Sequence, residues 1–197
     1  MLESLAAIDK AIFLFINVSL QNPVTDWAMP IITSDNVLRM AYAFTAILLL
    51  WKGNTRLRWL VLFSAITLFF SDQLSAGFLK PLIERVRPCH ALTDIHLLVG
   101  CGGGYTMPSS HAANAFGQAA LFSLTVRQTH WYLWVIAGLI SISRVFVGVH
   151  YPFDVLAGSV LGTLIGAGVV FGFELFEKKV MYRWKPGAST TESGTGQ

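Results

Sequence analysis

The chain has 197 residues, of which 54% are hydrophobic and 13% are charged, and its formal net charge is +3 at pH 7. A soluble domain carries about 25% charged residues, so this composition argues against a water-exposed protein and for a surface that faces lipid. The length suits a single domain. The basic residues stand in short clusters between apolar runs, a pattern that indicates membrane topology rather than nucleic-acid binding.

The N-terminal part of the chain differs from the rest. It includes Glu3 and Asp9 and lacks a basic lead into an apolar stretch, so no cleavable signal peptide is predicted. The longest apolar run within Leu5–Thr33 extends only from Ala11 to Leu20, which is too short to cross a bilayer. We therefore expect an amphipathic helix that lies on the membrane surface. The alternative is a distorted sixth spanning helix.

Five later segments are apolar and long enough, or nearly so, to span hydrocarbon, which takes roughly 20 residues. The expected fold is all-α: an integral membrane bundle of about five transmembrane helices plus the N-terminal interfacial helix. The first and third segments are short and are expected to extend by a turn. Pro152 favours a helix start just before the fifth segment. The five are Val37–Trp51, Leu57–Leu79, His111–Val126, Trp131–Val149 and Val155–Phe176.

We expect one membrane domain over residues 1–186, with the interfacial segment at 1–34 and the transmembrane core at 37–176. A Ser-, Thr- and Gly-rich tail at 187–197 is predicted to be disordered. With five spans, three basic clusters fall on one side, which the positive-inside bias assigns to the cytoplasm. They are Lys52, Arg56 and Arg58; Arg127; and Lys178, Lys179, Arg183 and Lys185.

The opposite, outer side collects the unusual polar residues. A single Lys or Arg at a span end is commonly explained by snorkelling. Seven polar residues converging on one face from three stretches, against the positive-inside bias, indicate a functional site. These residues are Lys80, Arg85, Arg87, His111, Arg144, His150 and Asp154.

Three short patterns contain most of these residues. Lys80 is followed after six residues by Arg87-Pro88; Pro108-Ser109-Ser110-His111 comes next; and Ser143-Arg144 is followed after five residues by His150 and after three more by Asp154. Together they resemble the three signature motifs of the type 2 phosphatidic acid phosphatase superfamily, which also includes vanadium-dependent haloperoxidases. The resemblance covers Lys80 to Asp154. Ser110 departs from the family pattern, which has Gly there, and this costs some backbone freedom.

The resemblance implies a phosphatase that uses a histidine nucleophile and neither metal nor cofactor. His150 would attack phosphorus, Asp154 would accept the other ring N–H of His150, and His111 would protonate the leaving oxygen and then activate water. The phosphate-binding residues would be Lys80, Arg87, Ser109, Ser110 and Arg144, which supply positive charge and hydrogen-bond donors. Arg85 and Glu84 stand outside the motifs and are interpreted as local salt bridging or headgroup contact.

Cys89 and Cys101 bracket the outer loop between the first two motifs. A loop outside the cytoplasm is exposed to oxidising conditions, so the two cysteines can form a disulfide. Two reduced thiols are the equal alternative, because a pair of cysteines alone does not establish pairing.

The predicted function is hydrolysis of a lipid phosphate or diphosphate in a bacterial inner membrane, with the active site facing the periplasm. Undecaprenyl diphosphate is the favoured substrate, because the short chain resembles small bacterial family members with that role. Phosphatidylglycerophosphate, phosphatidic acid and lipid A phosphates stay open, as does the oligomeric state. A vanadium haloperoxidase and a lipid-phosphate carrier are weaker alternatives, since the former relatives are larger and soluble and a carrier needs access from both faces.

Overall fold

The computed structural model describes residues 2–126 and 130–181, and within these ranges the chain is helical and contains no strand. The predictions for Arg127, Arg183, Lys185 and the 187–197 tail fall outside the described residues. The helices are α1 (Leu2–Leu14), α2 (Pro23–Ile32), α3 (Asp35–Lys52), α4 (Thr55–Asp72), α5 (Lys80–Ile83), α6 (Pro88–Ala91), α7 (Ser110–Thr125), α8 (His130–Phe146) and α9 (Pro152–Phe176). Three π-helical turns, η1 (Phe15–Ser19), η2 (Gln73–Leu79) and η4 (Glu177–Met181), continue α1, α4 and α9.

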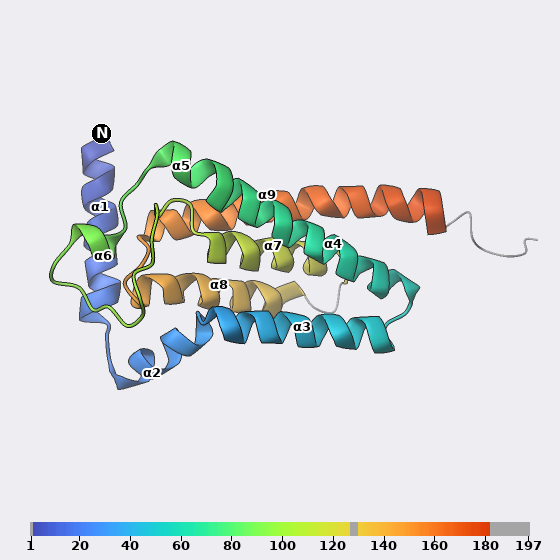
Figure 1. Ribbon diagram of the computed structural model, residues 1–197, viewed down its shortest axis with the longest axis horizontal. Coiled ribbons are helices and arrows are strands. Elements are labelled where there is room, and N and C mark those ends of the chain that lie inside the picture. Colours follow the sequence, from blue (N-terminus) through green and yellow to red (C-terminus); the bar gives the residue numbers. More distant parts are fainter. Residues whose placement is uncertain (1, 127–129, 182–197) are drawn as a thin grey trace, which may run out of the picture.

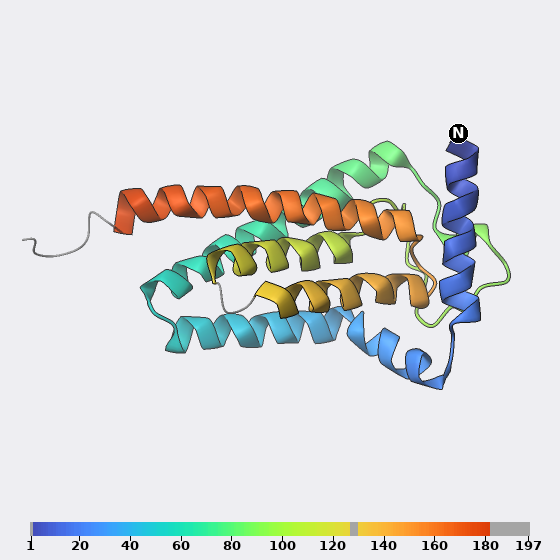
Figure 2. The ribbon, with the colours of Figure 1, turned by 180° about the vertical axis from the view of Figure 1, so that it is seen from behind.

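The long helices α3, α4, α7, α8 and α9 lie lengthwise beside one another, whereas α1 runs across one end of this bundle (Figures 1 and 2). The short helices α2, α5 and α6 lie at the same end as α1 (Figure 1). Helix α7 occupies the middle and packs against α9, α8 and α4. The outer loop between α6 and α7 therefore sits at the end of the bundle that α1 crosses.

The predicted spans correspond to α3, α4 with η2, α7, α8 and α9, and α9 begins at Pro152 as expected. Two stretches, Thr55–Ala91 and Pro152–Val180, are long and apolar enough to cross a membrane, and Trp131–Phe146 is a shorter apolar helix. The count of five spans stays a prediction. Helix α7 illustrates why composition does not decide the count: it is rich in Ala, Gly and Ser, because it is surrounded by other helices and needs no lipid-facing apolar side chains.

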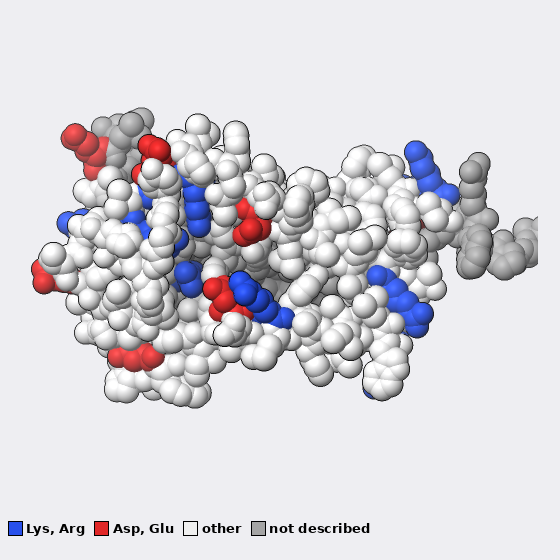
Figure 3. All heavy atoms as spheres, viewed as in Figure 1, with Lys and Arg blue, Asp and Glu red and all other residues white. Residues whose placement is uncertain are grey.

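The outer surface of the bundle is apolar. Large side chains along the long helices are exposed, among them Trp51 at 72%, Leu164 at 67% and Phe171 at 65%. On the face drawn in Figure 3, the charged residues gather toward the end crossed by α1 and at the opposite end, with a band lacking charge between them. Such a surface is favourable in a bilayer and would be an aggregation liability in water.

The tightest packing in the bundle is between α7 and α9. Gly158, Gly162 and Gly166 repeat every fourth residue along α9 and face the backbone of α7. A Cβ atom added at Gly162 would overlap the carbonyl oxygen of Ala113. Small residues let membrane helices approach closely, and here they bring the starts of α7 and α9 together. A backbone hydrogen bond of 2.9 Å from the Ser109 nitrogen to the Asp154 oxygen joins the two starts.

The N-terminal segment is attached to the bundle by buried polar side chains. Asn17 in η1 is fully buried, and its amide nitrogen donates to the Phe146 carbonyl at the end of α8 at 2.8 Å. Its side-chain oxygen accepts a hydrogen bond from the backbone nitrogen of His96 at 2.8 Å. Asn17, which interrupts the first apolar run of the sequence, thus caps the end of α8 and fixes the outer loop at His96. The crosswise course of α1 is compatible with an interfacial helix, and that location stays a prediction.

We predict that Gly162→Ala lowers stability by about 1–3 kcal/mol, because the added methyl group forces α7 and α9 apart. Gly168→Ala is the matched control, since a Cβ atom there meets no neighbouring atom within 4 Å. The midpoint of thermal unfolding in detergent measures the difference. Equal midpoints for the two variants would contradict this account of the packing.

Candidate active site

A cavity of about 770 Å³ opens between α3, α4, α7 and α8. Six of the predicted site residues line it: Lys80, Arg87, Ser110, His111, Arg144 and His150. They come from α5, the turn before α6, α7, α8 and the turn before α9. The structure thus brings together residues that are 70 positions apart in the chain. Ser109 and Asp154 do not line the cavity and are fully buried behind it.

The cationic residues are held by the surrounding backbone and one hydroxyl. Arg87 is only 8% exposed, and its guanidinium donates to the carbonyl oxygens of Gly104 and Val149, both at 3.3 Å. Arg144 donates from Nη1 to the Thr33 hydroxyl at 2.7 Å, while its buried Nε has no hydrogen-bond partner. A buried donor without a partner is costly, so this Nε is well suited to receive an anion.

Ser109 and Ser110 stand at the start of α7. The Ser109 backbone nitrogen donates to the Asp154 carbonyl oxygen and is therefore not free to bind a phosphate. Its buried hydroxyl has no partner. Ser110 makes a 3.0 Å hydrogen bond with Ser75 of η2 through its hydroxyl. The first N–H groups of an α-helix such as α7 lack carbonyl partners within the helix, and a helix N-terminus of this kind can bind an anion.

His150 is 2% exposed, and its Nδ1 lies 2.8 Å from the hydroxyl of Thr106. That hydroxyl also donates to Oδ2 of Asp154 at 2.6 Å. It has one hydrogen, so it accepts from His150 while it donates to Asp154. This network assigns the proton to Nδ1 and leaves Nε2 as the ring nitrogen available to the cavity.

The expected direct hydrogen bond between Asp154 and His150 is absent. Their Oδ2 and Nδ1 atoms are 3.6 Å apart, which is too long for a hydrogen bond. Asp154 also caps α9 by accepting from the Tyr151 nitrogen at 2.8 Å, and this contact holds the carboxylate on its own helix. Thr106 fills the remaining space. It precedes the second motif by two residues, and nothing in the sequence pattern distinguished it from other loop threonines.

Burial is the main reason that the pKa of His150 is lowered to about 3, and the positive charges of Arg144 and Arg87 lower it further. Asp154 acts in the opposite direction and is outweighed. The ring is therefore neutral at physiological pH, and a neutral imidazole has the free electron pair that a nucleophile requires.

His111 has its own partners, which the sequence reasoning missed. Its Nε2 lies 3.2 Å from Oδ1 of Asp35 and 3.2 Å from the carbonyl oxygen of Thr33. Both belong to the junction of α2 and α3, outside the recognised motifs and at the edge of the predicted first span. Asp35, Asp72 and Arg39 also line the cavity, so its wall carries both signs of charge.

Arg85 makes long-range salt bridges instead of local ones. Its two terminal nitrogens contact Oδ1 of Asp154 at 2.7 Å and Oδ2 of Asp9 at 2.5 Å. Glu84 instead accepts a 3.0 Å hydrogen bond from the Tyr105 hydroxyl. The salt-bridging interpretation of Arg85 is thus correct in kind, but its partners lie on α9 and α1.

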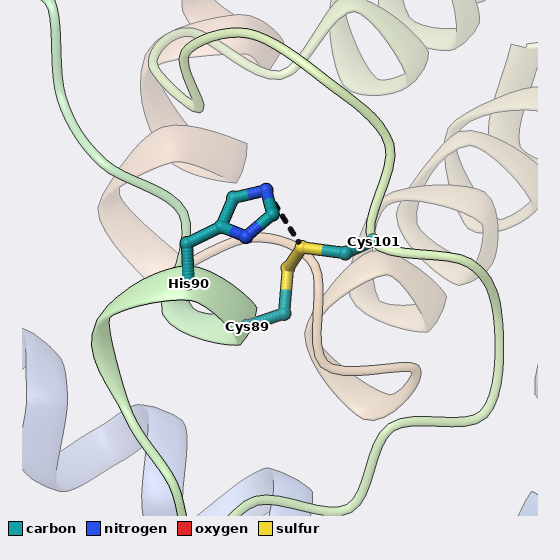
Figure 4. A group of neighbouring side chains, drawn as sticks. All are labelled: Cys89, His90 and Cys101. Carbon is teal, nitrogen blue, oxygen red and sulfur yellow. Dashed lines mark hydrogen bonds between the residues drawn. A yellow bond between two sulfur atoms is a disulfide. The ribbon is translucent and has the colours of Figure 1, made fainter.

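Cys89 and Cys101 form a disulfide in the structure, with their Cα atoms 5.9 Å apart (Figure 4). The bond ties the segment that follows Arg87 to the loop that leads to Thr106. Nε2 of His90 lies 3.3 Å from Sγ of Cys101 (Figure 4). It also lies 3.1 Å from the backbone oxygen of Gly102. These three side chains have metal-ligand types, but sulfurs joined in a disulfide are not the thiolates that bind metal.

Comparison with known proteins agrees with this geometry. The sequence profile of the PAP2 superfamily matches residues 57–177. The lipid A 4'-phosphatase of Bacteroides thetaiotaomicron is 34% identical over 82% of this chain and 75% of its own length. The undecaprenyl-diphosphatase BcrC of Bacillus subtilis is 31% identical over 74% of this chain and 73% of its own.

A solved structure has the same fold. The PAP2 type phosphatidylglycerolphosphate phosphatase of Bacillus subtilis superposes with a TM-score of 0.65, covering 90% of this chain and 88% of its own at 24% identity.

We predict that His150 makes the protein less stable as the pH falls. The folded protein keeps His150 neutral down to about pH 3, whereas the unfolded chain protonates it near pH 6.5, so the unfolded state binds more protons between these values. In His150→Gln the midpoint of thermal unfolding should therefore decline less steeply below pH 6.5 than in the wild type. His90→Gln, a change at an exposed position of the short helix α6, is the matched control. A His150→Gln slope equal to that of the wild type would refute the assignment.

The match to the family profile and to relatives over most of their length, together with a cavity that gathers all three motifs, shows that the chain belongs to the PAP2 superfamily, among its membrane-bound lipid phosphatases.

Proposed function

We propose that this protein hydrolyses a lipid phosphate or diphosphate through a phosphohistidine on His150, without a metal ion. The observation that carries the proposal is the cavity itself: a neutral imidazole, a second histidine and three cationic side chains face one space. Phosphoryl transfer is catalysed mainly by positioning and by stabilising the charge on the phosphoryl oxygens. The residues of the cavity supply both.

In the first step, Nε2 of His150 forms a bond to phosphorus while the bond from phosphorus to the leaving oxygen breaks. The electron pair of the broken bond stays on that oxygen, which takes a proton from His111. Lys80, Arg87 and Arg144 neutralise the equatorial oxygens, and Arg144 can use its unpartnered Nε. Asp35 lies 3.2 Å from Nε2 of His111, where its carboxylate can accept a hydrogen bond from the ring and orient it.

In the second step, water attacks the phosphohistidine. His111 takes a proton from the water as its oxygen bonds to phosphorus, and the nitrogen–phosphorus bond breaks to return neutral His150. The imidazole carries a positive charge while it is phosphorylated, because Nδ1 retains its proton. The Thr106 hydroxyl accepts a hydrogen bond from the Nδ1–H group of His150 and donates one to Asp154. Through these two hydrogen bonds the negative charge of Asp154 stabilises the positively charged ring.

The relatives suggest two substrates. Undecaprenyl diphosphate, the substrate predicted from the sequence, is supported by the similarity to the undecaprenyl-diphosphatase of Bacillus subtilis. A lipid A 4'-phosphate is supported by the longer match to the enzyme of Bacteroides thetaiotaomicron. The acidic residues Asp35 and Asp72 in the cavity wall can bind sugar hydroxyls, which favours the second candidate on chemical grounds.

We further propose that the protein lies in a bacterial inner membrane with this cavity open to the periplasm. The basic residues at the opposite end of the bundle support this orientation. Lys52, Arg56 and Arg58 lie at the α3–α4 turn, and Lys178 and Lys179 follow α9. The apolar tail of the substrate would lie among the helices while its phosphate enters from the membrane surface.

We predict that the purified protein releases phosphate from at least one of undecaprenyl diphosphate, lipid A, phosphatidylglycerophosphate and phosphatidic acid, with a metal chelator present throughout. His150→Ala should abolish turnover, because the variant lacks the ring nitrogen that forms the bond to phosphorus, and His111 is needed for proton transfer. Ser159→Ala is the control, since its hydroxyl donates to the Val155 carbonyl within α9 and does not line this cavity. Faster release from soluble monophosphates than from every lipid would contradict the proposal.

The same preparation tests the alternatives. Halide oxidation that depends on added vanadate would indicate a haloperoxidase. Lipid transport that survives in His150→Ala, without hydrolysis in the wild type, would indicate a carrier. Loss of wild-type activity on chelation, restored by a divalent cation, would overturn the metal-independent mechanism.

We predict that Thr106→Val lowers kcat on the order of 10- to 100-fold, the range for residues that orient a reacting side chain. Valine matches the shape of threonine but cannot join His150 to Asp154. Thr106→Ser retains the hydroxyl and should keep most of the activity, and Thr93→Val, in the exposed loop, is the matched control. If Thr106→Val had the same kcat as Thr93→Val, the Thr106 hydroxyl would not be needed to connect Asp154 with His150.

A further inference from the structure

The N-terminal helix α1 contributes one fully buried charge to the active-site end of the bundle. Asp9 has no exposed surface, although its neighbours Ile8 and Lys10 are exposed. Its Oδ1 accepts a 2.9 Å hydrogen bond from the Phe153 nitrogen in the first turn of α9, and its Oδ2 contacts Arg85. A buried carboxylate is costly unless it is paired and hydrogen-bonded, and both of its oxygens are satisfied here.

Arg85 connects Asp9 to Asp154, the carboxylate that contacts His150 through Thr106. One terminal nitrogen of its guanidinium contacts Asp9 and the other contacts Asp154, and the planar group lies over the ring of Tyr151 with 4.2 Å from Cζ to the ring centroid. The two carboxylate contacts and the Tyr151 ring together fix the orientation of the guanidinium. A point charge such as a lysine ammonium could not engage two carboxylates in the same way.

The charges in this group do not cancel. Two carboxylates share one guanidinium, so Asp9, Arg85 and Asp154 together keep a charge of −1. If Asp9 were neutral, Arg85 would neutralise Asp154. The negative charge matters because the far oxygen of Asp154 contacts Thr106, and Thr106 contacts His150.

We infer that Asp9 is a positioning residue for the phosphoryl transfer. It offsets the positive charge of Arg85 and fixes the orientation of its guanidinium. The negative charge of Asp154 is then not neutralised by Arg85 and can stabilise His150 through Thr106. The inference rests on the proposed function, because the positive charge to be stabilised forms on His150 only when its Nε2 bonds to phosphorus. Asp9 does not line the cavity and makes no contact with substrate. Its effect is therefore on the rate of the chemical step and not on substrate binding.

The test compares Asp9→Asn with Glu3→Gln, which makes the same carboxylate-to-amide change at an exposed position of α1. The amide oxygen of Asn can still accept from the Phe153 nitrogen, so the variant removes the charge and keeps that contact. We expect kcat of Asp9→Asn to fall on the order of 10- to 100-fold with KM within about twofold of the wild type. Glu3→Gln should match the wild type in both constants. The measurement uses whichever lipid the wild type hydrolyses fastest.

Arg85→Lys keeps the test decisive if Asp9→Asn fails to fold. It preserves the positive charge but cannot hold both carboxylates, so the same fall in kcat at unchanged KM is expected. A single-turnover measurement should show that formation of the phosphohistidine is the slowed step. If Asp9→Asn folds and its kcat is within twofold of the wild-type value, the inference about Asp9 is wrong while the proposed function stands. If Asp9→Asn does not fold, the same result for Arg85→Lys leads to the same conclusion. A wild type that hydrolyses none of the lipids would overturn the proposed function, and the inference with it.

Discussion

The close contact between α7 and α9 is the constraint on which the rest of the structure depends. Glycines at every fourth position of α9 let its backbone touch that of α7, and the Ser109 nitrogen donates to the Asp154 carbonyl where the two helices begin. The second and third motifs stand at these two starts. A separation larger by one methyl group would move His150 relative to the start of α7, and positional errors of about 1 Å are costly in catalysis.

The electrostatics of the site follow from burial. Cations from the first and third motifs face a cavity that is partly closed to water, where their attraction for a phosphate is stronger than at an exposed surface. The same burial keeps His150 uncharged, so its ring retains the free electron pair that the proposed attack on phosphorus requires. Asp154 would otherwise favour protonation of the ring. Asp154 lies 3.6 Å from Nδ1 with the Thr106 hydroxyl between them, so it remains near enough to stabilise a positive charge on the ring in the proposed mechanism.

The N-terminal segment is part of the site's support. Asn17 caps α8 and holds the outer loop, Thr33 and Asp35 contact Arg144 and His111, and Asp9 reaches the first turn of α9. Each contact crosses more than 70 positions of sequence. A segment that lies across the end of the bundle can reach several helix ends at once, which explains why polar residues interrupt an otherwise apolar stretch.

Composition and hydropathy alone determined that the chain is a helical membrane protein, and motif spacing identified six of the residues that line the cavity, because apolar periodicity and short motifs are local properties of a chain. Pro152 likewise marked the start of α9, since a proline's fixed φ acts on its own helix. Only the tertiary structure decided that Thr106 stands between Asp154 and His150, that Asp35 is the partner of His111, and that Arg85 joins Asp9 to Asp154. Those contacts depend on how α1, α3 and the outer loop pack against the bundle, and a threonine or aspartate that acquires its role through packing looks in the sequence like any other polar residue.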